Sequence, residues 1–131
     1  MGESPVILVV EDSQTQAQEL AARLYDCGLE VLIANDGPAA LRIVDAYKPD
    51  VVVLDLTLPT MSGHQICDRL KRDPATTHIP VIMLTAASSP ADIQAGYRHG
   101  ADAYIPKGSF AINHLISTLQ RMGLPMTNGV A

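Results

Sequence analysis

Positive charge and long hydrophobic runs are both scarce in this 131-residue chain. Nine Lys and Arg residues stand against 14 Asp and Glu residues, giving a formal net charge of −5. That balance argues against a protein that binds nucleic-acid phosphates or an anionic membrane surface. The hydrophobic runs, such as residues 51–54, are far shorter than the ~20 residues of a transmembrane helix, and no basic-then-apolar leader precedes Pro5. We therefore expect a cytoplasmic protein that neither binds nucleic acid directly nor inserts into a membrane.

Cysteine is rare as well, since the chain has only Cys27 and Cys67. Neither belongs to a Cys-x-x-Cys motif or lies near a pair of histidines, so neither a metal cage nor a disulfide framework is indicated. We expect both to be core thiols. The histidines are dispersed, share no face that the sequence identifies, and are expected to be solvated. They are His64, His78, His99 and His114.

The chain does contain enough apolar residues for one compact domain. Hydrophobic residues make up 47% and charged residues 18% of the sequence, and the mean hydropathy is +0.15. These values are typical of a folded globular protein and argue against a disordered or fibrous one. We predict a single domain over residues 1–131, with a core from about 5 to 124. Residues 125–131 lack an apolar period and are expected to form a flexible tail.

Two hydrophobic periods alternate along the chain. Residues 6–10, 51–54 and 81–84 are continuous aliphatic runs, too short for helices, and predict strands buried on both faces. Residues 29–34 and 103–105 are weaker strand candidates. Between them, apolar residues recur with helical spacing, and the stripes fall within 17–25, 40–47, 66–70, 93–97 and 112–119. This alternation predicts an α/β fold with a parallel sheet and helices on both faces.

Local signals mark where several helices begin and end. The S-x-x-Q spacing of Ser13 with Gln16, and of Ser62 with Gln65, predicts two capping boxes, in which hydroxyl and amide each satisfy a backbone donor. Ser89 followed by a proline predicts another helix start. Helix ends are predicted at three glycines and before two prolines. These are Gly28, Gly100, Gly123, Pro49 and Pro74.

Polar residues follow four of the predicted strands. The first strand delivers Glu11 and Asp12, the third Asp55, the fourth Thr85, and the fifth Lys107. The carboxyl ends of parallel strands share one edge of the sheet, so these groups should converge. Two carboxylates 4 Å apart repel each other by about 4 kcal/mol at an effective dielectric constant of 20, so a cation is expected between them. Oxygen ligands without His or Cys favour Mg2+ or Mn2+, and the lysine and threonine could hold an anion such as a phosphoryl group.

Asp55 opens the segment D-L-T-L-P-T-M-S-G, which resembles the phosphorylation-site segment of response-regulator receiver domains. That family also has an acid pair after the first strand, a Thr or Ser after the fourth, and a Lys after the fifth. Here these are Glu11-Asp12, Thr85 and Lys107, in the same order. The resemblance covers nearly the whole chain. It implies a flavodoxin-like, doubly wound (βα)5 fold with a five-stranded parallel sheet in the order 2-1-3-4-5.

The resemblance also implies the chemistry of the site. Asp55 would be the phosphoacceptor, whose carboxylate attacks a phosphohistidine and forms an acyl phosphate. Asp12, Asp55 and the backbone carbonyl of Thr57 would hold Mg2+, or Mn2+ as a substitute, with Glu11 acting chiefly through water. Lys107 would pair with a phosphoryl oxygen. The domain would thus catalyse its own phosphorylation and dephosphorylation, with no independent metabolic activity expected.

A conformational switch is implied next. Thr85 would bond to another phosphoryl oxygen, and its inward movement would leave space toward which Tyr104 can turn. The surface of the fourth helix, fifth strand and fifth helix would then change its affinity for an unknown downstream protein. The same surface could form a homodimer. The implied phosphodonor is a histidine kinase or a histidine phosphotransfer protein.

The chain departs from the family pattern at two places. Lys107 precedes Gly108 and follows Pro106, whereas the family usually has proline directly after the lysine, often in a cis bond. Glu11 replaces the commoner Asp at the first acid position, and metal binding should survive the extra methylene.

Other function classes fit the residues less well. One alternative is an interaction module that keeps the receiver fold without phosphorylation, although such a module has no need of three mutually repelling acids. A haloacid-dehalogenase-like phosphatase should have D-x-D after the first strand, where this chain has Asp12-Ser13-Gln14. A flavodoxin-like cofactor protein should place phosphate-binding donors where Glu11 and Asp12 would repel phosphate.

Overall fold

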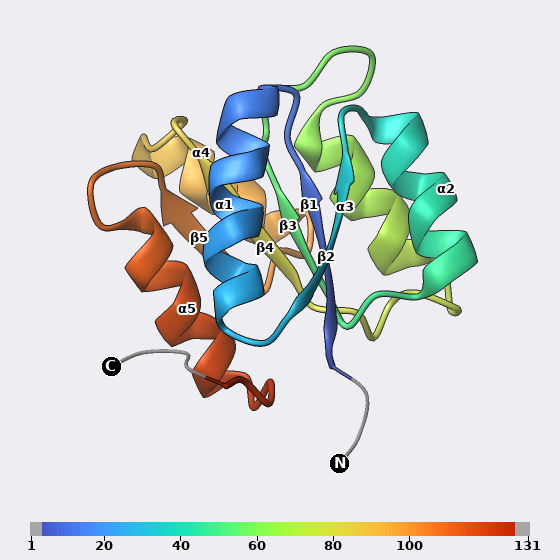
Figure 1. Ribbon diagram of the computed structural model, residues 1–131. Coiled ribbons are helices and arrows are strands. Elements are labelled where there is room, and N and C mark those ends of the chain that lie inside the picture. The colour runs from blue at the N-terminus through green and yellow to red at the C-terminus, as the bar shows by residue number, and fades with distance from the viewer. Residues whose placement is uncertain (1–3, 128–131) are drawn as a thin grey trace.

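The architecture is a parallel β-sheet covered by helices on both faces (Figure 1), in a computed structural model that describes residues 4–127. The described strands are β1 (Val6–Val10), β2 (Glu30–Ala34), β3 (Val51–Leu54), β4 (Val81–Thr85) and β5 (Ala103–Pro106). They form one sheet in the order β2-β1-β3-β4-β5, with every neighbouring pair parallel. The predicted α/β class and the order 2-1-3-4-5 are therefore confirmed.

The helices are α1 (Gln14–Asp26), α2 (Gly37–Tyr47), α3 (Gly63–Arg72), α4 (Pro90–Arg98) and α5 (Ala111–Arg121). Helices α1 and α5 cover one face of the sheet, and α2, α3 and α4 cover the other. The aliphatic strands have no face that meets water, because alternate side chains enter the two hydrophobic cores. In β3 all four residues are buried, as the continuous run of apolar residues predicts.

Two of the strands are one residue longer than predicted. Thr85 and Pro106 form the last pair of the β4–β5 ladder, although neither belongs to the aliphatic runs. Beyond that pair, the Lys107 amide donates to the Thr85 carbonyl oxygen at 2.9 Å. Strand pairing therefore continues to the edge of the sheet and places Lys107 next to the end of β4.

The helix starts agree with the predicted caps in all but one respect. At Ser62, the hydroxyl accepts from the Gln65 amide, and the Gln65 side chain accepts from the Ser62 amide, which completes the capping box. The capping box predicted at Ser13 is wrong in one half. The Ser13 hydroxyl accepts from the Gln16 amide, but the Gln16 side chain is bonded to Lys107 instead. A distant partner has overridden the local motif.

The helix ends follow the predicted residues. Gly28, Gly100 and Gly123 have φ angles of +85°, +103° and +86°, in the left-handed region that favours glycine. Helix α2 ends two residues before Pro49, where Lys48 itself adopts a left-handed conformation with φ of 46°. Helix α3 ends at Arg72, before Pro74.

The two cysteines are buried in opposite cores, Cys27 with α1 and Cys67 with α3, as expected of core thiols. Burial raises the pKa of the Cys67 thiol to about 11, so it stays protonated at neutral pH. The tail predicted at 125–131 is described as far as Thr127, whose amide donates to the Cys27 carbonyl oxygen at 2.7 Å. Residues 128–131 lie outside the described residues. Within 4–127, no helix has the length and apolar character needed to cross a membrane.

Candidate functional site

The candidate site lies at the carboxyl edge of the sheet, where backbone pairing fixes the residues that follow each strand. The Glu11 amide donates to the Ala34 carbonyl oxygen at 3.0 Å, and the Asp55 amide donates to the Val10 carbonyl oxygen at 3.1 Å. These bonds extend the ladders by one residue beyond β1 and β3. Glu11 and Asp55 are consequently held beside each other, and each is only 7% exposed. Figure 1 shows this edge at the top of the molecule, where α1 also begins.

The Lys107 ammonium joins the two buried carboxylates. Its Nζ lies 2.8 Å from Glu11 Oε1 and 2.8 Å from Asp55 Oδ2, and it donates a third hydrogen bond to Gln16 Oε1 at 2.7 Å. An ammonium has three N–H donors, so all of them are used. The cation expected between the acids is therefore supplied, for Glu11 and Asp55, by the chain's own lysine.

Backbone amides satisfy the other carboxylate oxygens. Glu11 Oε2 accepts from the Ser13 amide at 3.0 Å, and Asp55 Oδ1 accepts from the Thr57 amide at 3.1 Å. Each oxygen thus has one donor and keeps a lone pair for a further partner. Burial alone would lower the pKa of Lys107, but its hydrogen bonds to Asp55 and Glu11 outweigh burial and raise that pKa. The lysine is therefore charged throughout the physiological pH range.

Asp12 does not join this hydrogen-bonded group. Its side chain is exposed and makes no hydrogen bond or ion pair to the other described residues. Within residues 4–127, no three His, Cys, Asp or Glu side chains are gathered closely enough to hold a metal ion. Of the three carboxylates predicted to converge, Glu11 and Asp55 are joined through Lys107, while the Asp12 side chain is exposed.

The donor chemistry nevertheless suits a hard divalent cation. Glu11 and Asp55 offer carboxylate oxygens with unused lone pairs, and the exposed Asp12 follows Glu11 directly in the chain. Oxygen-only sets of this kind favour Mg2+ or Mn2+ over zinc or copper. The residues present therefore fit the predicted metal.

Thr85 and Tyr104 meet at the loop that follows β4. Thr85 is 1% exposed, and its hydroxyl accepts from the Ala87 amide at 3.4 Å. The Tyr104 hydroxyl donates to the carbonyl oxygen of the same Ala87, and its ring is buried. A Cβ on Gly96 would lie 2.6 Å from the Tyr104 ring, so α4 leaves room for the aromatic side chain only because residue 96 is glycine. Tyr104 is thus turned inward in this structure.

Gln16 is the site residue that sequence analysis missed. Its position three residues after Ser13 predicted a capping role, and nothing in the local pattern signals a contact with Lys107. Gln16 and Lys107 are brought together because α1 and α5 pack side by side on one face of the sheet, and the Lys107 side chain extends from the loop before α5 to Gln16 in the first turn of α1.

A second cluster contradicts the prediction that the histidines are solvated and share no face. The rings of His64 and His99 lie with centroids 4.5 Å apart, and His99 Nδ1 lies 3.0 Å from Asp68 Oδ1. His64 Nδ1 is buried without a hydrogen-bond partner. The start of α3 and the end of α4 pack together here, which sequence spacing alone could not show. His78 and His114 are exposed, as predicted.

His64 should make stability sensitive to mild acid. Burial and the neighbouring His99 lower the pKa of His64, with Arg98 acting in the same direction and Asp68 and Asp92 opposing them. The folded state binds a proton on His64 less tightly than the unfolded state does. The contribution of His64 to the free energy of unfolding is therefore full above about pH 6.5 and is lost as the pH falls below that value.

We expect the His64→Phe variant, which keeps an aromatic ring against its neighbour, to lose less stability than the wild type between pH 7.5 and 5.5. Urea unfolding across that pH range measures the difference. His114→Phe, at an exposed position on α5, is the control and should keep the wild-type slope. An equal loss of unfolding free energy between pH 7.5 and 5.5 in all three proteins would contradict the assignment of this acid sensitivity to His64.

Two hollows help to delimit the site. A small one of about 200 Å³ adjoins Lys107 and is lined mainly by α1 and the start of α5, including Gln16, Leu20 and Ile112.

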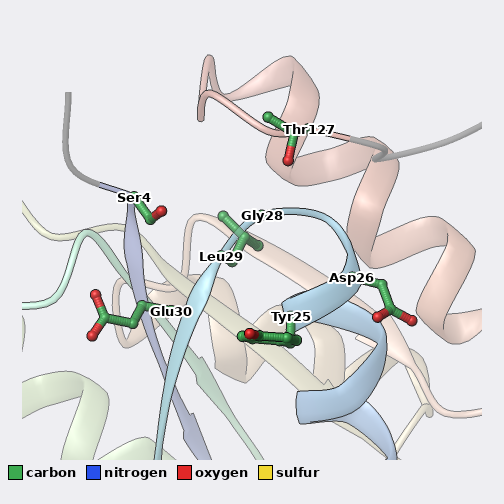
Figure 2. Close-up of a pocket in the computed structure, with 7 residues that line it drawn as sticks. All are labelled: Ser4, Tyr25, Asp26, Gly28, Leu29, Glu30 and Thr127. Carbon is green, nitrogen blue, oxygen red and sulfur yellow. The ribbon is translucent and has the colours of Figure 1, made fainter. Parts of the chain in front are cut away.

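A second hollow, a pocket of about 360 Å³, lies at the opposite edge of the sheet, between the end of α1, the start of β2 and Thr127 (Figure 2). Its side chains, among them Tyr25 and Glu30, belong to none of the groups described above.

Comparison with known proteins decides the family. The response regulator receiver domain family matches residues 7–120, which is most of the chain. This chain belongs to that family. The acid pair, Asp55, Thr85 and Lys107 thus lie in a receiver domain of the kind found in two-component response regulators, whose members interact with histidine kinases and generally bind a divalent metal.

Three relatives illustrate the match. The sensory transduction protein RegX3 of Mycobacterium bovis is 40% identical over 114 residues, which cover 87% of this chain and 48% of RegX3. The signal receiver domain of a signal transduction histidine kinase from Syntrophus aciditrophicus is 34% identical, with a TM-score of 0.84 and 98% of both chains covered. The Mn2+-bound form of the response regulator Rcp1 is 27% identical, with a TM-score of 0.77, covering 92% of this chain and 94% of Rcp1. The receiver domain spans about half the length of RegX3.

Proposed function

We propose that this receiver domain is a phosphoacceptor switch in which Asp55 accepts a phosphoryl group from a phosphohistidine. The observation that carries the proposal is the buried Asp55 carboxylate held 2.8 Å from the Lys107 ammonium at the carboxyl edge of the sheet. In the transfer, an Asp55 oxygen forms the new P–O bond while the P–N bond to the donor histidine breaks. The imidazole leaves with the electron pair of that bond.

The residues around Asp55 have distinct parts in the proposed transfer. The Thr57 amide bonds to one carboxylate oxygen and orients the group, so that the nucleophile need not be ordered during the reaction. Lys107 donates toward the other oxygen and offers a fixed positive charge to the incoming phosphoryl oxygens. Thr85, at the end of β4, is the candidate donor to a further phosphoryl oxygen.

Asp12, Asp55 and the Thr57 backbone carbonyl would hold Mg2+, with Glu11 contributing chiefly through water and Mn2+ as a substitute. A bound divalent cation would supply charge neutralisation for the phosphoryl oxygens as they approach the acids. The exposed Asp12 remains available for this purpose because no described residue pairs with its carboxylate.

The switch would operate through Thr85 and Tyr104. Both side chains are bonded to Ala87, so movement of Thr85 toward a phosphoryl group removes one of the contacts that hold this loop. Tyr104 would then turn toward the space that Thr85 leaves. The surface of α4, β5 and α5 would change its affinity for a partner protein. Tyr97 and Met122, which are 50% and 37% exposed, supply apolar area on that surface for a downstream protein or for a homodimer.

The proposed partners follow from the same chemistry. The donor is a histidine kinase or a histidine phosphotransfer protein, and we place the domain in the cytoplasm with it. The downstream target is a protein that reads the α4–β5–α5 surface. The formal charge of −5 gives no support for direct nucleic-acid binding by the domain itself.

The direct test is phosphorylation by a small donor. We expect the protein, incubated with acetyl phosphate and Mg2+, to gain one phosphoryl group of about 80 Da in its intact mass. Beryllofluoride, which imitates the phosphoryl group on a carboxylate, separates a short-lived product from no reaction. Failure of both mass gain and beryllofluoride binding would favour the phosphorylation-independent interaction module.

A further inference from the structure

Among residues 4–127, the hydrogen bond from Lys107 is what joins the Gln16 side chain to the site. Its side-chain oxygen accepts a hydrogen bond from the Lys107 ammonium at 2.7 Å, and its backbone amide donates to the Ser13 hydroxyl at 3.3 Å. The backbone contact with Ser13 fixes Gln16 in the first turn of α1. Its side-chain oxygen therefore extends from a helix rather than from a loop.

The three contacts of Lys107 differ in what happens to them during phosphoryl transfer. Asp55 Oδ2 belongs to the reacting carboxylate, so its bond to the ammonium must be exchanged when the acyl phosphate forms. Glu11 and Gln16 do not react, and their two bonds can persist. With two acceptors holding the ammonium, its third N–H can change acceptor from the Asp55 carboxylate to a phosphoryl oxygen while the nitrogen stays in place.

We propose that Gln16 is a positioning residue that, together with Glu11, holds the Lys107 ammonium in place while its third hydrogen bond passes from Asp55 to the phosphoryl group. This inference rests on the proposed phosphoacceptor function.

The neutrality of Gln16 matters in this role. A third carboxylate on the ammonium would hold it equally well, but would add negative charge beside a phosphoryl group that carries about −1.5 to −2. An apolar side chain of the same length would repel nothing but would leave one N–H to water. Only a neutral acceptor orients the lysine without opposing the phosphoryl group.

Gln65 provides a matched control on another helix. It occupies the same S-x-x-Q position after Ser62, and its amide also donates to the serine hydroxyl. Its side-chain oxygen, however, accepts from the Ser62 amide and has no contact with Lys107. A Gln65→Met substitution therefore makes the same change of residue at a helix start where the side chain does not bond to Lys107.

The test compares Gln16→Met, Gln16→Glu and Gln65→Met with the wild type by two measurements. The first is the affinity for beryllofluoride in the presence of Mg2+, and the second is the same affinity when each substitution is made in a Lys107→Ala background. We expect Gln16→Met to weaken beryllofluoride binding by about fivefold, because one hydrogen bond to a charged group is lost at an exposed position. Gln65→Met should bind as the wild type does.

The Lys107→Ala background separates positioning from a general structural effect. Gln16→Met should weaken beryllofluoride binding only where Lys107 is present, because Gln16 acts through its hydrogen bond to that lysine. Gln16→Glu keeps an acceptor for the lysine but should also weaken binding, because its charge repels the phosphoryl analogue. Wild-type affinity in Gln16→Met, or an equal loss in both backgrounds, would overturn the inference.

Failure of the proposed function looks different. In that case the wild type itself binds no beryllofluoride, and the inference about phosphoryl transfer is withdrawn with it. If the wild type binds beryllofluoride and the Gln16 variants bind it equally well, the phosphoacceptor function stands and the role of Gln16 is rejected.

Discussion

Replacement of Asp55 by Asn should abolish the Mg2+-dependent gain of about 80 Da from acetyl phosphate. The amide has nearly the same shape as the carboxylate, and its oxygen can still accept from Lys107 or from the Thr57 amide. It is uncharged and is not a competent nucleophile toward phosphorus, so the loss should be complete rather than partial. Removal of Mg2+ with a chelator should have the same effect on the wild type. Intact-mass spectrometry measures both results.

The same strand supplies a matched control for this substitution. Asp50 directly precedes β3 as Asp55 directly follows it, and Asp50 Oδ2 accepts from the Val6 amide at 2.8 Å at the opposite edge of the sheet. Asp50→Asn should retain the full mass gain. Circular dichroism would verify that both variants are folded. A phosphoryl group on Asp55→Asn would contradict the assignment and would point to a different acceptor.

Gly63→Ala should lower the free energy of unfolding by about 3 kcal/mol, because the added methyl group would force the backbone at Asp55 and Leu56 to move. A Cβ at Gly63 would lie 2.5 Å from the Asp55 carbonyl oxygen and 2.8 Å from Leu56 Cα. Both are backbone atoms, which cannot rotate away as the end of a side chain can. The Gly63 amide also donates to the Leu56 carbonyl oxygen at 3.0 Å, so the start of α3 is tied to the segment after β3.

Urea unfolding of Gly63→Ala and Gly108→Ala would test this steric argument. Gly108 is exposed, and a Cβ there would meet no atom within 4 Å, so its substitution should change the free energy of unfolding by less than about 1 kcal/mol. Equal stabilities of the two variants would mean that α3 does not approach the Asp55 carbonyl as closely as described. Because the clash lies on Asp55 itself, Gly63→Ala should also reduce phosphorylation.

The periodicity of the sequence determined the fold class. Runs such as residues 51–54 are apolar without interruption, and a segment of that length can be buried on both faces only as a central strand of a parallel sheet covered by helices. The stripe from Ala17 to Leu24 likewise fits one face of a helix. These are local properties, since each follows from the spacing of apolar residues within one segment.

The sequence also predicted most of the residues at the candidate site. Glu11, Asp55, Thr85 and Lys107 directly follow strands or lie within two residues of a strand end, and parallel strands deliver such residues to one edge. The register of the sheet, including the Asp55 bond to Val10, brings the first two together as expected.

Only the tertiary structure decided which polar groups pair. Gln16 satisfies a helix-capping pattern by its spacing, yet its side chain bonds to Lys107, which lies at the other end of the chain. His64 and His99 likewise meet because the start of α3 packs against the end of α4. The physical reason is common to both cases. Helix periodicity and strand order are set by short-range spacing, whereas the partner of a polar side chain depends on the rotations and separations of packed elements, which no single segment encodes.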